Sequence, residues 1–149
     1  ILTDNTYFIE ANADTTITVP GTAYLSITVG GYNHRTESAF IYSSRGNTRY
    51  NLQNPDFIAP AVNVYGPLPN NSYGNLSGTS IAAAITAGAC ALMLQWGKDR
   101  PGIRMNAITL KSLLIKGATR RNGVQYPNRE SGYGILNLSE TFNALRIIQ

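Results

Sequence analysis

A run of small and apolar residues from 79 to 97 is the sequence feature that most restricts the fold. The run is long enough for a helix of about five turns, and it ends at Gly97, a residue type common at helix C-termini. Apolar side chains occupy nearly every face of this helix. Because a helix that is apolar all round is normally buried on all sides, we predict that it lies inside a layered domain.

The segments before this run have the residue pattern of strands. Runs of β-branched and apolar residues that end at Gly or Pro are typical of strands in a sheet with both faces covered. Strands are expected in these segments: short edge strands within 1–21, a buried parallel strand at 24–32, a short strand at 39–42, and two strands within 56–68 that are separated by Pro60.

Two further helices are predicted after the long one. The first covers about 106–116 with Asn106 as its N-cap, and the second begins at Asn137, where Glu140 three residues later completes a capping-box pattern. Strands followed by long helices indicate an α/β fold with a mainly parallel sheet. The side chains of the first helix that are expected to face inward are Ile108, Leu110, Leu113 and Leu114.

The composition fits one globular domain of 149 residues, 43% of them hydrophobic. The net charge of +4 is spread along the chain, with Arg120 and Arg121 as the only adjacent pair, which is typical of a solvated surface and not of a nucleic-acid interface. Cys90 is the only cysteine, so an internal disulfide and a cysteine metal cluster are excluded. We expect Cys90 to be a small buried hydrophobe.

No apolar run reaches the length of a transmembrane helix, and no signal peptide is visible. We therefore expect neither a membrane nor a nucleic acid as a partner. The chain begins with Ile1 and not with Met, which is compatible with a natural start further upstream.

Ser80 lies at the start of the predicted long helix and is the candidate reactive group. The first-turn amides of a helix, including that of Ser80, are free donors, and the helix dipole there favours a developing negative charge. Small residues on both sides, Gly78 and Ala82 to Ala84, leave room for a substrate backbone. The alternative interpretation is that Ser80 simply caps the helix, a role that Thr79 or Ser77 could equally fill.

The segment GTSIAAAITAG, residues 78–88, resembles the nucleophile motif of subtilisin-like serine proteases. Further resemblances occur in the same order as in that family, from about Thr16 to Leu145. They are YLSITVGGY (24–32), SAFIYSSRG (38–46), DFIAPAVNVYG (56–66) and SGYGILNL (131–138). The resemblance implies an α/β fold that is the C-terminal half of a subtilisin-like three-layer domain, with a mainly parallel sheet and a buried nucleophile helix.

The resemblance also implies roles for particular residues. Ser80 would be the catalytic nucleophile, its own backbone amide would be one oxyanion donor, and cleavage of a peptide bond would pass through an acyl-enzyme. The turn at Val19, Pro20 and Gly21 resembles the floor of the substrate pocket. Two departures from the family pattern, Ala84 for proline and Ala61 for glycine, leave the nucleophile untouched.

A serine hydroxyl needs a base, yet the chain contains only one histidine, His34. Asp4 or Asp14, then His34, then Ser80 would reproduce the order of the family's triad. We reject this assignment because His34 lies in GGYNHRTE, which corresponds to a surface loop of the family. Asn12 is likewise rejected as the oxyanion asparagine. The aspartate, the histidine and that asparagine are therefore expected outside this chain, and the chain alone should be inactive.

Residues 1–15 resemble the end of an insertion found in subtilases of clostridia and in the related spore-germination proteases. We interpret residues 1–15 as the tail of that insertion or as an edge segment, and 16–149 as the C-terminal part of the peptidase domain. The implied partners are a peptide or protein substrate and the N-terminal part of the domain. The resemblance also favours an extracellular or spore-associated location. No metal ligands are assigned here, although the family often binds calcium.

Three hypotheses follow from these patterns. The first is the serine-bearing part of a subtilisin-like endopeptidase. The second is a regulatory pseudoprotease that keeps the fold with a broken triad. The third is a plain α/β structural domain in which Ser80 only caps a helix.

Overall fold

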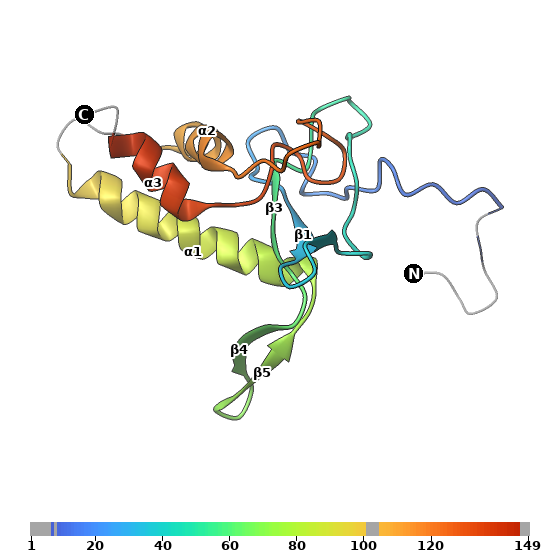
Figure 1. Cartoon of the computed structure of the whole chain (residues 1–149), viewed down its shortest axis with the longest axis horizontal. Coiled ribbons are helices and arrows are strands. Elements are labelled where there is room, and N and C mark those ends of the chain that lie inside the picture. The colour runs from blue at the N-terminus through green and yellow to red at the C-terminus, as the bar shows by residue number, and fades with distance from the viewer. Residues whose placement is uncertain (1–6, 8, 101–104, 147–149) are drawn as a thin grey trace.

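The computed structural model describes residues 7, 9–100 and 105–146. Figure 1 shows α1 running beside the strands β1 and β3, with α2 and α3 next to it and the β4–β5 hairpin projecting away from the rest of the chain. The elements in chain order are β1 (Val29–Asn33), β2 (Ser38–Ala39), β3 (Phe57–Pro60), β4 (Val64–Leu68), β5 (Ser72–Leu76), α1 (Thr79–Lys98), α2 (Ala107–Gly117) and α3 (Leu138–Arg146).

The central sheet has the strand order β2-β1-β3. β1 and β3 are parallel, with Val29 opposite Phe57, while the short β2 is antiparallel to β1. Gly31 in β1 permits close packing there, because a Cβ atom at this position would lie 2.6 Å from the Cβ atom of Ala61. A parallel bridge between Ile58 and Ile135 adds the chain after α2 to the other side of β3.

The core forms where the helices meet the sheet. α1 packs against both β1 and β3, and α2 packs against α3. The larger core cluster consists of Phe57, Met93, Leu110, Leu114 and Leu145, and a smaller one consists of Ala59, Ala61 and Ala82. The small side chains of the second cluster let the first turns of α1 approach the ends of β1 and β3. Cys90 is half-buried and packs against the larger cluster.

The prediction that the long helix is buried on all sides is wrong for this chain. Its buried residues are Ala82, Thr86, Ala89, Met93 and Gly97, which form one stripe. The opposite side, which includes Ala83, Ala87, Gly88, Ala91 and Leu92, is exposed. The apolar pattern is therefore real, but the described part of the chain covers only one face of α1.

The expectation that no apolar run is long enough to span a membrane also needs correction. By length and composition alone, α1 could cross a membrane, since it has 20 residues and a mean hydropathy of 1.4 in its most apolar window. The core helix of a soluble protein meets the same criteria, so this is weak evidence.

The predicted strand at 24–32 is shorter than expected, because β1 begins only at Val29. The amide of Thr28 donates to the carboxylate of Asp56 at 2.8 Å and not to a neighbouring strand. Tyr24 and Leu25 are exposed. The edge strands expected within 1–21 are also not found among the described residues of that range, and the strand expected at 39–42 is only the short β2.

The caps of α2 and α3 are confirmed. The Oδ1 atom of Asn106 accepts from the amide of Thr109 at 2.9 Å, and that of Asn137 accepts from the amide of Glu140 at 3.0 Å. Leu110 and Leu114 face inward as predicted. Ile108 does not, since 60% of it is exposed at the start of α2.

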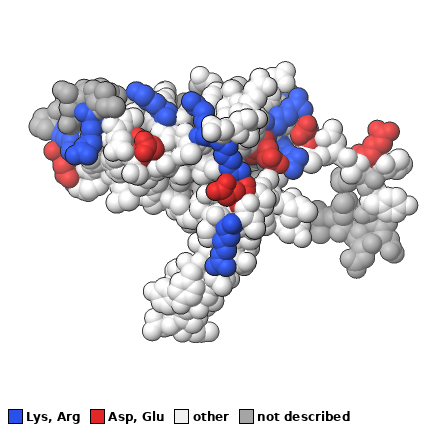
Figure 2. Space-filling model, viewed as in Figure 1, with Lys and Arg blue, Asp and Glu red and all other residues white. Residues whose placement is uncertain are grey.

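No charged residue lies between Asp56 and Lys98 in the sequence. This stretch includes β3, the projecting β4–β5 hairpin and nearly all of α1. Figure 2 shows the hairpin free of Lys, Arg, Asp and Glu, with charges placed over other parts of the chain. On the hairpin, the rings of Tyr65 and Tyr73 stack at 5.9 Å and remain largely exposed.

We expect Leu114→Ala to destabilise the protein by about 2–5 kcal/mol, because Leu114 is fully buried between the helices and β3. Leu94→Ala is the matched control, since Leu94 is 45% exposed on α1. Denaturant-induced unfolding of both variants measures the difference. Equal losses of stability for the two variants would contradict this location of the core.

Candidate active site

The start of α1 leaves the amides of its first turn free of a side-chain cap. Gly78 is the N-cap residue, and among the described residues no side chain caps this helix end. Its φ of 151° is a conformation that favours glycine. Ser77 instead accepts the amide of Asn63 at 2.9 Å. Ser80 lies two residues inside the N-cap, so the interpretation of Ser80 as a helix cap is wrong.

Ser80 borders a pocket of about 390 Å³. Pro20 and Gly21, which sequence comparison assigns to the pocket floor, line the same pocket, together with Thr79 and Ala83 from the first turns of α1. Val19 is 83% exposed and is not among the described residues that line it. The structure thus brings Pro20 and Gly21 together with Ser80 at one pocket, which Val19 does not line.

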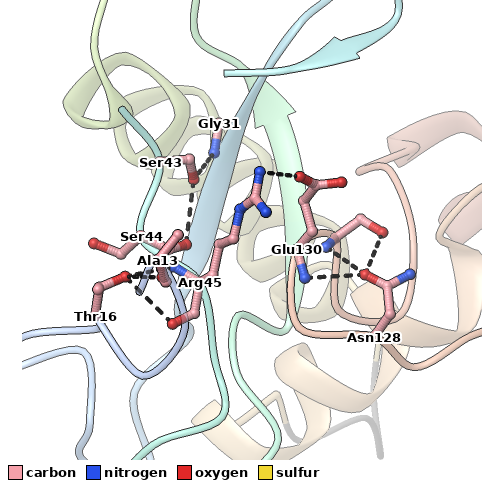
Figure 3. A network of polar contacts seen from close by, with 9 residues as sticks. Ala13, Thr16, Gly31, Ser43, Ser44, Arg45, Asn128 and Glu130 are labelled. Carbon is pink, nitrogen blue, oxygen red and sulfur yellow. Dashed lines mark hydrogen bonds and ion pairs between the residues drawn. The ribbon is translucent and has the colours of Figure 1, made fainter. Parts of the chain in front are cut away.

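One wall of the pocket is formed by Ser43 and Ser44. Figure 3 shows how this wall is held: the Ser43 hydroxyl accepts the amide of Gly31 at 3.0 Å, so it is fixed to β1. The next residue, Arg45, forms an ion pair with Glu130 at 2.7 Å. This pair is half-exposed, so we regard it as an orienting contact and not as a large source of stability.

A second wall consists of residues 20–30, and it is connected to a buried carboxylate. The Oδ2 atom of Asp56 accepts the amide of Thr28 at 2.8 Å, and its Oδ1 atom pairs with Nζ of Lys111 on α2 at 2.8 Å. The Asp56 side chain is only 2% exposed. Burial raises the pKa of Asp56, and the hydrogen bonds from Lys111 and Thr28 oppose that shift.

The pairing of Asp56 with Lys111 was not predicted from the sequence. The available signal was weak: a carboxylate directly before an apolar strand, and a lysine among the inward-facing positions of the predicted helix. Neither feature identifies its partner, because the two residues meet only after α2 has packed beside the sheet.

None of the described polar residues considered for a triad lines the pocket that Ser80 borders. His34 is exposed in the turn after β1 and does not line the pocket. Asp14 pairs with Arg129 at 2.7 Å, and Asn12 accepts the amide of Asp14 at 2.8 Å. Asp4 lies outside the described residues. The structure therefore gives Ser80 no base from His34 or Asp14, in agreement with their rejection on sequence grounds.

The chemistry available in the pocket follows from its lining. Among the described residues that line it, none is charged, and hydroxyl groups and small apolar side chains predominate. The pocket can therefore receive a neutral side chain beside a hydroxyl and a helix N-terminus, where a developing oxyanion is favoured. In the described ranges, no three His, Cys, Asp or Glu side chains come close enough to hold a metal ion.

Comparison with known proteins gives matches over most of the chain. The profile of the subtilase family matches residues 4–134. The serine protease AprX of Bacillus subtilis is 35% identical over 104 residues, covering 56% of this chain and 24% of AprX. Pyrolysin of Pyrococcus furiosus is 31% identical over 114 residues, covering 72% of this chain and 8% of pyrolysin.

Among solved structures, the CspB protease of Clostridium perfringens superposes with a TM-score of 0.89 at 35% identity. The superposition covers 95% of this chain and 31% of CspB. It confirms the α/β, subtilisin-like fold expected from the motifs. The chain spans less than a third of each of these three proteins.

We expect the free energy of unfolding to depend on pH through Asp56. Burial raises the pKa of the folded carboxyl above its ordinary value of 3.8. The contribution of Asp56 to stability is therefore fully present below the ordinary pKa and is lost as the pH rises through the raised value. Asp56→Asn cannot ionise and lacks this dependence.

Denaturant unfolding of both proteins between about pH 3 and pH 7 measures the effect. The stability of the wild type relative to the Asn variant should fall as the pH rises. A relative stability that increases with pH would show that the pKa of Asp56 is lowered.

Proposed function

Because the chain belongs to the subtilase family of serine peptidases, we propose that it is the nucleophile-bearing part of a serine endopeptidase, with Ser80 as the attacking residue. The observation that carries this proposal is the position of Ser80 at the uncapped start of α1, on the edge of a pocket that Pro20 and Gly21 also line. The names of AprX and of the superposed CspB, both printed as proteases, support the same class of reaction.

The proposed reaction uses Ser80 in two ways. Its hydroxyl attacks the carbonyl carbon of the scissile peptide bond, and its own amide donates a hydrogen bond to the oxyanion that forms. The amine leaves with a proton from the base, and water then hydrolyses the acyl-enzyme to restore the hydroxyl. The base, the carboxylate that orients it and a second oxyanion donor are proposed to come from the remaining part of the peptidase domain.

The exposed face of α1 is the proposed contact surface for that remaining part. Its side chains at Ala83, Ala87, Gly88 and Ala91 are small and uncharged, so another element can pack closely against them. Leu92, 58% exposed on the same helix, would gain burial in the contact. The face begins next to Ser80, which is where a base contributed by the covering part has to lie.

The proposed substrates are peptides or proteins. The uncharged lining of the pocket beside Ser80 favours an uncharged side chain before the scissile bond. An extracellular or spore-associated location and calcium binding by the complete protein stay predictions from the family resemblance, as does the boundary between 1–15 and 16–149.

The regulatory pseudoprotease is the alternative function. The relatives reported above lend it no support, since AprX and CspB are both named as proteases. Upstream sequence discriminates the two functions, because an intact aspartate and histidine motif would favour the enzyme and their loss the pseudoprotease.

In the full-length protein, Ser80→Ala should abolish labelling by a fluorophosphonate probe and lower kcat for peptide cleavage by a factor on the order of 10⁶, because the nucleophile is lost. Ser77→Ala is the matched control, since Ser77 only accepts an amide in the turn before α1. Equal labelling of wild type and Ser80→Ala would disprove the assignment of the nucleophile.

The 149-residue chain alone should not react with the probe, since no His, Asp or Glu is among the described residues that line the pocket of Ser80. Labelling of this chain that depends on Ser80 would mean that a base within it has been overlooked. His34→Ala would then identify whether His34 is that base.

In the full-length protein, Ala87→Glu should reduce thermal stability and activity together, because it places a charge on the face of α1 that the remaining part of the domain is proposed to cover. Asn143→Glu, at an exposed position of α3, is the control. Thermal unfolding measures the difference, and an unchanged midpoint for Ala87→Glu would show that this face stays exposed to solvent.

A further inference from the structure

The second wall of the pocket, residues 20–30, has a pocket on each side. In front of it lies the pocket that Ser80 borders, and Gly21, Ser26 and Thr28 face that pocket. Behind it lies a second pocket of about 290 Å³, which Ala23 and Leu25 line. Because there is open space behind the wall, packing alone does not fix its position, and its hydrogen bonds have to do so.

The hydrogen bonds that hold the wall involve the ion pair between Lys111 and Asp56. Nζ of Lys111 donates to the carbonyl oxygen of Ser26 at 2.9 Å as well as to Asp56. Asp56 in turn accepts the amide of Thr28, and its own amide donates to the carbonyl oxygen of Thr28 at 2.7 Å. The ammonium group of Lys111 thus contacts the wall directly, at Ser26, and indirectly, through the carboxylate of Asp56.

The ion pair is connected to the pocket floor through Thr28. The hydroxyl of Thr28 donates to the carbonyl oxygen of Gly21 at 2.7 Å. The buried side chain of Asn54 donates to the same oxygen at 3.0 Å. A continuous chain of polar contacts therefore connects Lys111 to Gly21. Lys111 pairs with the carboxylate of Asp56, and that carboxylate accepts the amide of Thr28. The hydroxyl of Thr28 then donates to the carbonyl oxygen of Gly21.

We propose that Lys111 and Asp56 are positioning residues for the substrate pocket, and that they set the preference of the protease for the side chain before the scissile bond. This inference rests on the proposed function. Neither residue touches the reacting atoms. The pair holds the wall at the separation from Ser80 that a bulky, uncharged side chain needs, whereas a glycine at the same substrate position makes no contact with the wall.

The burial of the pair explains why its loss should matter. Asp56 is 2% and Lys111 24% exposed at the side chain, so water replaces the missing contacts poorly. Without the ammonium group, the carbonyl of Ser26 and one oxygen of Asp56 lose their donor, and the wall is free to move into the space behind it. A displacement of about 1 Å in a substrate contact can lower the rate about 100-fold.

The test uses the full-length protein and two peptide substrates that differ only before the scissile bond, one with leucine and one with glycine. The measured quantity is the ratio of kcat/KM for leucine to kcat/KM for glycine. This ratio does not depend on the concentration of folded enzyme, so a variant that is merely less stable leaves it unchanged.

Lys111→Met should lower the ratio about 10-fold or more, while the protein that remains folded still reacts with a small fluorophosphonate at Ser80. Lys111→Arg keeps the positive charge and should restore most of the ratio. Lys116→Met is the matched control, because Lys116 is exposed on the same helix. An unchanged ratio in folded Lys111→Met would overturn the proposal.

The double variant Lys111→Met with Asp56→Asn decides the question if the single variant does not fold. It leaves no unpaired buried charge, so the fold is better preserved, and the asparagine oxygen can still accept the amide of Thr28. A lowered ratio in this variant supports the positioning role of the pair, and a normal ratio refutes it. If the wild type itself neither cleaves peptides nor reacts with the probe, the proposed function fails and not only this inference.

Discussion

The buried carboxylate of Asp56 holds the pocket wall and α2 against the central sheet. Asp56 joins three parts of the chain that are distant in sequence. Its carboxylate accepts the amide of Thr28, just before β1, and pairs with Lys111 on α2. Its backbone carbonyl accepts the amide of Tyr133, in the turn before the last helix, at 2.8 Å. A buried carboxylate is costly unless each of its oxygens has a donor, and here both do. The need to satisfy this one group fixes where β1 begins and where the pocket wall lies.

The start of α1 fixes the position of Ser80 at the edge of the pocket. Gly78 lets the chain turn sharply from the β4–β5 hairpin into the helix, and its amide donates to the carbonyl of Ala61 at 2.8 Å, which ties the turn to the end of β3. Ser80 is thereby held by the sheet and not by a flexible loop. The same helix exposes an uncharged face along its length, so the group that activates Ser80 and the element that covers the helix can belong to one missing part of the domain.

Local sequence signals predicted the local structure well. The helix caps at Asn106 and Asn137 were confirmed because each cap depends on contacts within one turn, and the motif around Ser80 led to the correct family. Predictions that depended on distant residues were less accurate. Residues 24–28 have the composition of a strand, but the amide of Thr28 is bound by Asp56. The apolar pattern of α1 predicted burial on all sides, but the described chain covers only one of its faces.

A crystal structure of the complete protein bound to a peptide boronate would test the role of Ser80. We expect a covalent bond between boron and Oγ of Ser80, a histidine from the upstream part of the chain within hydrogen-bond distance of that oxygen, and the side chain of the inhibitor in the pocket next to Gly21. A boronate attached to another residue, or an Ser80 with no base within reach, would contradict it.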